Sequence, residues 1–106
     1  MSDRRVVITG LGMVSPVGLN VKTSWENVLA GKSGITAITH FDVSDFSVRF
    51  GGSVKNFDGG DLVTSKDARK MDTFIQYGIV AADEAIKDSG LEITDENAER
   101  IGVAIG

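Results

Sequence analysis

The sequence lacks several residue types that carry much of catalytic chemistry. Its 106 residues include no cysteine, one histidine (His40), one proline and one tryptophan. Without cysteine, the chain has no thiolate nucleophile, no disulfide and no cysteine-ligated metal or iron–sulfur centre. A single histidine also excludes any zinc site that needs two imidazoles. We therefore expect no metal site, and we interpret His40 as a packed or hydrogen-bonded loop residue.

Positive charge and long apolar runs are also scarce. Lysine and arginine number 11 against 15 acidic residues, which gives a formal net charge of −4. This is the wrong sign for non-specific binding to nucleic acid. No stretch approaches the ~20 apolar residues of a membrane-spanning helix. Arg4 and Arg5 precede an apolar run, but Asp3 and the glycines that follow interrupt the signal-peptide pattern. We expect a cytoplasmic protein that binds neither nucleic acid nor membrane.

The apolar pattern that is present predicts an α/β fold. Hydrophobic residues make up 42% of the chain and charged residues 25%, as in ordinary globular proteins. Apolar runs at 5–9 and 101–106 predict buried strands, and alternation at 48–50 predicts another. Asn20 is a plausible N-cap for a helix that Gly31 ends. Because helices alternate with strands, we expect a β-α-β-α-β order and a parallel or mixed sheet.

The strongest predicted element is one helix from about Ser65 to Ser89. Thr64 is its expected N-cap, with Asp67 three residues later, and Gly90 is its expected stop. The middle of this helix is apolar on almost every side, which is typical of helices covered by more than one layer. An apolar strand then closes the sequence with no covering element after it. We therefore expect the chain to be a piece of something larger.

A glycine-rich loop after the first predicted strand partly matches a dinucleotide-binding fingerprint. Gly10 and Gly12 fit the first two glycines, but Ser15 stands at the third position and Pro16 follows it. The next helix begins several residues too late to place a pyrophosphate at its N-terminus. We interpret the loop as a structural turn and keep a small nucleotide-binding protein as the less favoured alternative.

Lys66, Arg69 and Lys70 form the most informative charged cluster. Their i, i+3, i+4 spacing places them on one arc of the predicted helix. They also fall in its first turns, where the helix dipole disfavours a cation by ~0.3–1 kcal/mol. An anionic partner would relieve this cost, but so would a solvated face eased by Asp67 and Asp72. The spacing alone leaves both interpretations open.

A longer series of motifs resembles the β-ketoacyl-acyl carrier protein synthases. In chain order the motifs are Val6–Gly18, Gly31–Ile35, Arg69–Asp72, Phe74–Gly78 and Asp88–Leu91. The Ser15-Pro16-Val17-Gly18 form and the Arg-Lys-Met-Asp run are most similar to synthase II, the elongating enzyme of bacterial fatty acid synthesis. The resemblance covers all 106 residues.

The resemblance implies a fold and an activity. The fold is thiolase-like, with two related βαβαβ halves layered in a homodimer, and residues 1–106 would supply the first part of the N-terminal half. Family members condense an acyl chain with malonyl-acyl carrier protein by decarboxylative Claisen chemistry, without a cofactor. Their cysteine nucleophile, two histidines and lysine have no counterpart in this sequence, and His40 matches none of them. We therefore expect no catalytic residue here, and an inactive isolated chain.

The resemblance also implies a partner. In the family, basic residues at the start of this helix dock the acidic acyl carrier protein, loaded with acyl or malonyl groups. Lys66, Arg69 and Lys70 stand at those positions, which favours docking over a solvated face. A carrier-binding module that works alone and without catalysis is the other hypothesis. It belongs to a different functional class from an enzyme segment.

Overall fold

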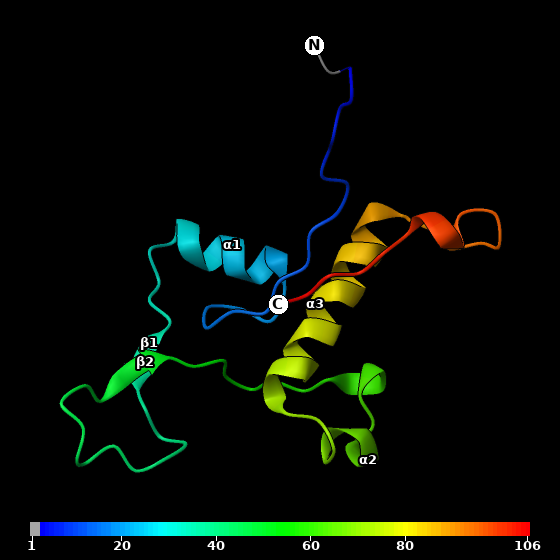
Figure 1. Ribbon diagram of the computed structural model, residues 1–106. Coiled ribbons are helices and arrows are strands. Elements are labelled where there is room, and N and C mark those ends of the chain that lie inside the picture. Colours follow the sequence, from blue (N-terminus) through cyan, green and yellow to red (C-terminus); the bar gives the residue numbers. More distant parts are fainter. Residues whose placement is uncertain (1–2) are drawn as a thin grey trace.

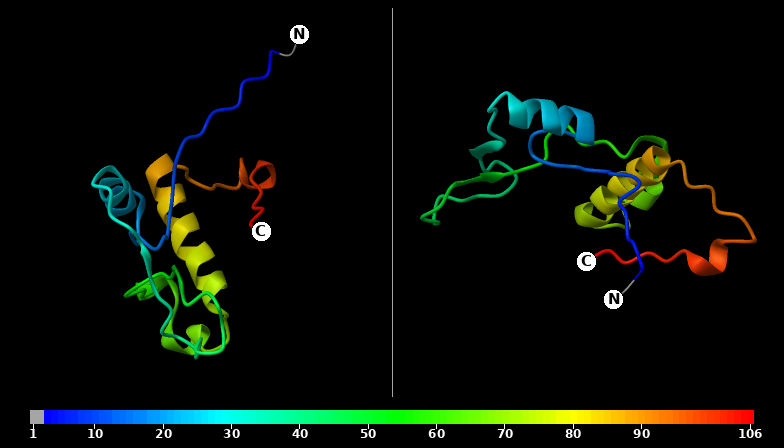
Figure 2. Two further views of the ribbon diagram at one scale, coloured as in Figure 1. Left: turned by 90° about the vertical axis from the view of Figure 1, so that its left-hand side faces the viewer. Right: turned by 90° about the horizontal axis from the view of Figure 1, so that it is seen from above.

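The computed structural model describes residues 3–106, and helix α3 (Thr73–Ser89) runs through the middle of the molecule (Figure 1). The other elements, in chain order, are α1 (Val21–Leu29), β1 (Ile35–Ala37), β2 (Phe50–Gly52), η1 (Gly60–Leu62), α2 (Ser65–Ala68) and η2 (Ala98–Arg100). Figure 2 shows α1 on one side of α3 and the C-terminal segment on another. No helix within 3–106 has both the length and the apolar character needed to cross a membrane.

The predicted helix caps are confirmed. The Asn20 side chain accepts a hydrogen bond from the Thr23 N–H at the start of α1. The Thr64 side chain does the same for the Asp67 N–H at the start of α2. Gly90 ends α3 with a φ of +70°, in the left-handed region that glycine adopts without steric cost. Local side-chain chemistry therefore determines where these helices begin and end.

The prediction of one continuous helix is wrong, because two helices meet at a corner. Helix α2 ends at Ala68, and α3 begins at Thr73. Between them Asp72 has an extended backbone, with φ −64° and ψ 154°, and its carboxylate accepts the Thr73 N–H at 2.7 Å. An aspartate that caps the next helix offers the backbone an alternative to continuing the first one. This competition separates α2 from α3.

The strands predicted at 5–9 and 101–106 are not formed within the part of the chain that the structure describes. Both segments are extended, but neither pairs with a neighbouring strand there. Val6 is 88% exposed and Val103 is 82% exposed, so the expected burial is also absent. An extended segment becomes a strand only when a neighbour satisfies its backbone N–H and C=O groups. No such neighbour lies beside them within residues 3–106.

The one sheet among residues 3–106 is a two-stranded antiparallel pair rather than a parallel or mixed sheet. β1 and β2 pair with Ile35 opposite Gly52 and Ala37 opposite Phe50. The alternation predicted at 48–50 thus becomes a strand only from Phe50, and the strand continues through Gly51 and Gly52. β1 lies in a stretch for which we predicted no helix or strand. The two strands together form a small hairpin-like arm beside the helices (Figure 1).

The folded chain buries little of its own surface. Its accessible surface is 8871 Å², whereas a compact monomer of this mass exposes about 5,700 Å². Its radius of gyration is 17.5 Å, against about 13 Å for a compact domain of this length. Among the described residues only Val63 and Ser24 are buried. The apolar surface that the sequence provides is mostly left open.

Candidate functional site

The glycine-rich loop lies directly on helix α3. A Cβ atom added at Gly12 would fall 1.7 Å from the Ala81 carbonyl oxygen, and one added at Gly10 would fall 2.3 Å from that of Ala85. Real Cβ atoms do not approach oxygen this closely, so both positions require glycine. These two glycines therefore serve close packing of backbone on helix. This supports the interpretation of the loop as structural rather than nucleotide-binding.

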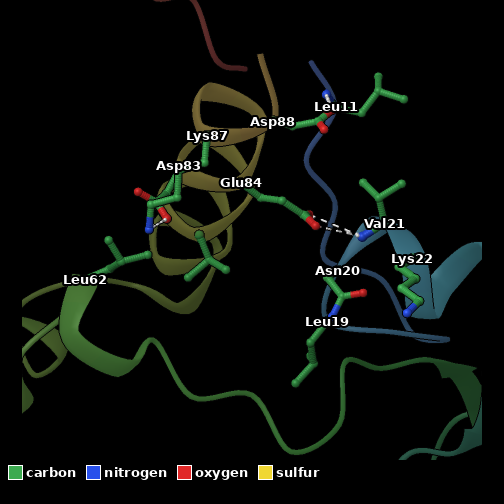
Figure 3. Close-up of a pocket in the computed structure, with 11 residues that line it drawn as sticks. Leu11, Leu19, Asn20, Val21, Lys22, Leu62, Asp83, Glu84, Lys87 and Asp88 are labelled. Carbon is green, nitrogen blue, oxygen red and sulfur yellow. Dashed lines mark hydrogen bonds and ion pairs between the residues drawn. The ribbon is translucent and has the colours of Figure 1, made fainter. Parts of the chain in front are cut away.

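Two carboxylates on α3 hold the same loop from the side, and we call Glu84 and Asp88 the carboxylate clamp (Figure 3). Asp88 Oδ2 accepts the Leu11 N–H at 3.0 Å. Glu84 Oε1 accepts the Met13 N–H at 2.9 Å. Both Glu84 oxygens also lie within hydrogen-bond distance of the Val21 N–H, at 3.2 and 3.1 Å. The clamp thus joins the loop and the first residue of α1 to α3.

A cavity of about 590 Å³ opens beside the clamp (Figure 3). It is lined by Leu11, Leu19, Asn20, Val21, Lys22, Leu62, Val80, Asp83, Glu84, Lys87 and Asp88. Four of its five charged side chains already have partners within the chain, because the clamp binds backbone amides and Lys87 Nζ lies 2.8 Å from Asp83 Oδ2. We therefore interpret the cavity as a feature of the packing and not as a ligand site. Sequence reasoning did not identify the clamp; two acids four residues apart on one helix were the available signal.

The predicted docking residues lie together at the turn after α2, and we call Lys66, Arg69 and Lys70 the basic corner. Lys66 belongs to α2, Arg69 is its C-cap, and Lys70 follows. The Lys70 N–H donates to the Asp67 carbonyl oxygen at 2.9 Å, which closes the turn. All three basic residues are exposed. The structure thus keeps the three cations close in the chain and open to solvent.

The argument from the helix dipole is wrong for this cluster. Arg69 and Lys70 follow the end of α2 and precede the N-cap of α3, so they do not occupy the first turn of a long helix. The N-terminus of α3 instead has an acid, Asp72, whose carboxylate bonds to the first helical N–H. An acid there matches the sign of the dipole. The basic corner therefore carries no dipole penalty that a partner must relieve.

Gln76 is a further residue at this corner that sequence reasoning missed. Its side-chain amide donates to the carbonyl oxygens of Ala68 and Met71, at 3.5 Å in each case. It is half-buried, unlike the three cations. A glutamine four residues after an N-cap aspartate was the only signal for it. Its side chain bridges the end of α2 and the segment before α3.

His40 lies in an exposed loop and belongs neither to the carboxylate clamp nor to the basic corner. Its ring packs edge-on against Phe41, with ring centroids 4.8 Å apart. It lines an open cavity of about 880 Å³ together with Lys55, whose amino group already donates to the Gly34 and Ser53 carbonyl oxygens. The ring has no hydrogen-bond partner within residues 3–106, so packing is its observed role. The same range holds no group of three or more histidine and acidic side chains arranged for a metal ion.

Comparison with known proteins places the sequence in one family. The family described as beta-ketoacyl synthase, N-terminal domain, matches residues 3–106. The 3-oxoacyl-[acyl-carrier-protein] synthase 2 of Vibrio harveyi is 62% identical over 106 residues, which is all of this chain and 26% of the relative. The protein of the same name from Staphylococcus aureus strain N315 is 54% identical over 104 residues, or 98% of this chain and 25% of the relative.

The fold comparison points the same way. A solved structure described as the ishigamide ketosynthase/chain length factor is similar at a TM-score of 0.75 and 34% sequence identity. The match covers 86% of this chain and 23% of that chain. The chain thus has part of the thiolase-like α/β fold and spans about a quarter of the length of the curated relatives it matches. It belongs to the β-ketoacyl synthase family, whose N-terminal domain matches it from residue 3 to residue 106.

Proposed function

We propose that residues 1–106 form the N-terminal portion of a 3-oxoacyl-[acyl-carrier-protein] synthase that elongates fatty acids. The observation that carries this proposal is the 62% identity to the Vibrio harveyi synthase 2 across the whole chain. In the proposed reaction, malonyl-acyl carrier protein loses carbon dioxide, and its α-carbon bonds to the carbonyl carbon of an enzyme-held acyl group. The thioester bond that joined this acyl group to the enzyme breaks, and the enzyme thiolate leaves. The enzyme would act as a cytoplasmic homodimer. This chain would supply scaffold and carrier docking, with the nucleophile and histidines located elsewhere.

The scaffold role is supported by the uncovered apolar surface. The segments 5–9 and 101–106 are extended, apolar and exposed, as strands would be before a sheet forms around them. We expect the isolated chain to bind a hydrophobic dye and to unfold without a sharp transition, because its apolar surface lacks cover. Dye fluorescence and thermal melting measure this. A cooperative transition without dye binding would contradict the scaffold role.

The docking role is supported by the charge and exposure of the basic corner. Lys66, Arg69 and Lys70 are exposed cations in a chain of net charge −4. The curated relatives are named for an acyl carrier protein substrate, and an acidic carrier would be attracted to such a surface. Exposed ion pairs contribute ~0.2–1 kcal/mol each. Three pairs together then contribute about 0.6–3 kcal/mol, which corresponds to roughly 3- to 150-fold in carrier affinity.

The test uses a chimera in which this chain replaces the matching segment of the Vibrio harveyi relative. The three corner residues are changed together to alanine, and condensation is measured with carrier-bound and with coenzyme A-bound acyl substrates. We expect the KM for carrier substrates to rise roughly 3- to 150-fold at low salt. The rise should shrink as salt screens the charges. Small acyl-CoA substrates, which need no carrier surface, should be affected far less.

A matched control removes the same charge elsewhere. Lys22, Lys32 and Arg100 are exposed cations on other elements, and their triple alanine variant changes the net charge by the same amount. Carrier KM should stay close to that of the parent chimera. If the two triple variants behave alike, the effect comes from net charge and the corner is a solvated face.

The isolated 106-residue chain should release no carbon dioxide from malonyl-acyl carrier protein. Release would contradict the proposal that this chain supplies scaffold and docking while the catalytic residues lie elsewhere.

A further inference from the structure

Because α2 and α3 meet at a corner, the axis of α3 does not set the direction in which the three cations of the basic corner point. In one continuous helix, Lys66, Arg69 and Lys70 would point in directions set by α3 itself. In the structure, α2 is a separate turn at the start of α3 and not in line with it (Figure 1). The direction in which the cations face therefore depends on whatever fixes α2 against α3.

Most hydrogen bonds at this place act within α2 or within α3. The Ala68 N–H donates to the Thr64 carbonyl oxygen at 2.8 Å, and the Lys70 N–H closes the following turn. These bonds shape α2 but leave its orientation free. The Asp72 carboxylate caps α3 through its immediate neighbour, at 2.7 Å. None of these bonds reaches from the body of α3 back to α2.

Gln76 makes that connection. It lies one turn inside α3, and its amide group has two N–H donors, which suit two carbonyl acceptors. It donates to the oxygens of Ala68, the last residue of α2, and of Met71, which follows Lys70. Within residues 3–106 neither carbonyl has a second hydrogen-bond partner, and no other α3 side chain bonds to residues 65–71. Each bond is long, at 3.5 Å, and both start from the same side-chain nitrogen.

We infer that Gln76 is the positioning residue of the basic corner: its amide fixes α2 against α3, so that the three cations face an acidic carrier protein together. The inference rests on the proposed carrier docking. Gln76 is half-buried and uncharged and need not contact the carrier. It acts through the orientation of the cations. Its contribution to docking therefore exists only while the cations are present.

The experiment replaces Gln76 in the chimera with methionine, which has a similar length and good helix propensity but no N–H donor. Because net hydrogen-bond contributions are modest, we expect the KM for carrier substrates to rise about 3- to 10-fold. The kcat and the KM for acyl-CoA should not change. Gln76→Ala carries the same expectation and serves if the methionine variant does not fold. Asn97→Leu is the matched control, because that amide also bridges a turn, donating to the Glu92 oxygen at the other end of α3.

A double-mutant cycle separates this inference from the proposed docking. In the background of the triple alanine corner variant, Gln76→Met should change carrier KM by less than about 2-fold, because the two changes act on one interaction. An equal fold-change in both backgrounds, an equal loss with acyl-CoA, or an equal loss in Asn97→Leu would overturn the positioning role. If the triple variant itself keeps a normal carrier KM, the proposed docking is wrong, whatever the effect of Gln76→Met. If only the triple variant has an effect, docking stands and the role of Gln76 is wrong.

Discussion

The two ends of α3 are held by different kinds of contact. Along its C-terminal half, the backbone of Gly10 and Gly12 approaches the helix so closely that no side chain fits between them, and the carboxylate clamp holds the same loop. At its N-terminal end, the basic corner is attached by an N-cap and by two long hydrogen bonds from Gln76. The C-terminal half of α3 leaves no room for a side chain where the loop contacts it, whereas the N-terminal end carries exposed, charged side chains.

This difference separates scaffold from surface. Steric contact between backbones tolerates almost no change, because neither the loop nor the helix backbone can move aside cheaply. Hydrogen bonds at an exposed corner contribute less and can be replaced by water. Substitutions at the loop end should therefore act on stability, and substitutions at the corner should act on partner binding.

Gly12→Ala should have the largest effect. The new Cβ would lie 1.7 Å from the Ala81 carbonyl oxygen, which is backbone and cannot rotate away. We expect a loss of at least about 3 kcal/mol of stability, or failure to fold. Soluble yield and the thermal midpoint of the chimera measure it. Gly51→Ala is the control, because a Cβ there meets only the Ile38 side chain, at an ordinary contact distance of 3.7 Å. Equal behaviour of the two variants would show that the loop does not pack on α3.

The sequence predicts those features at the two ends of α3 that depend only on residues close in the chain. The caps at Asn20, Thr64 and Gly90 were read correctly, because a cap needs only residues within one turn. The break at Asp72 was missed, because the same aspartate fits both a helix interior and an N-cap, and the apolar periodicity continued through it. The sequence locates the charged cluster correctly. Because the break at Asp72 is not visible in the pattern, the pattern places the cluster in the first turns of one long helix, and the argument from the helix dipole is wrong for that reason.

The long-range features could not be read from local pattern. Glu84 binds the N–H groups of Met13 and Val21, which are 71 and 63 residues away. Nothing in the local spacing of Glu84 distinguishes it from an acid on a solvated helix face. The strands expected at 5–9 and 101–106 were read from apolar composition alone, which says that a segment can be buried but not which strand covers it. The family resemblance supplied the fold where local pattern did not.

Glu84→Ala should have the next largest effect. It leaves the Met13 N–H and the Val21 N–H without their acceptor. Of these two donors the Val21 N–H is half-buried, and losing its acceptor costs about 1–3 kcal/mol, so the thermal midpoint of the chimera should fall while carrier KM stays unchanged. Glu26→Ala is the control, since Glu26 is exposed on α1 and its side chain makes no hydrogen bond within residues 3–106. A change in carrier KM without a change in stability would reverse the assignment of scaffold and surface.

Asp72→Ala should cost less stability and affect docking more. It removes the N-cap of α3, which is worth about 1 kcal/mol, and it removes the residue that separates α2 from α3. Alanine favours helix at this position, so the cations should change direction and carrier KM should rise. Asp95→Ala, an exposed acid in a turn, is the control. A normal carrier KM together with lowered stability would mean that the corner's orientation does not matter for docking.

Breaking the ion pair between Asp83 and Lys87 should have the smallest effect. The two side chains are 2.8 Å apart at i,i+4 spacing and are 30% and 72% exposed. Such pairs contribute ~0.3–0.5 kcal/mol, and salt screens them. A double-mutant cycle with Asp83→Asn and Lys87→Ala should give a coupling of that size at low salt and almost none in ~1 M salt, where the Debye length is about 3 Å.

Asp83 and its neighbour Glu84 then provide a direct comparison of two carboxylates on one helix. Asp83 faces an exposed ammonium group, while Glu84 accepts hydrogen bonds from backbone N–H groups of the loop and of α1. An exposed cation released from its partner is rehydrated by water, but the half-buried Val21 N–H that loses its acceptor is rehydrated less easily. Removing Glu84 should therefore cost several times more than removing the ion pair, and the difference should persist in high salt. Equal costs for the two would mean that charge, and not satisfaction of backbone donors, holds the loop to α3.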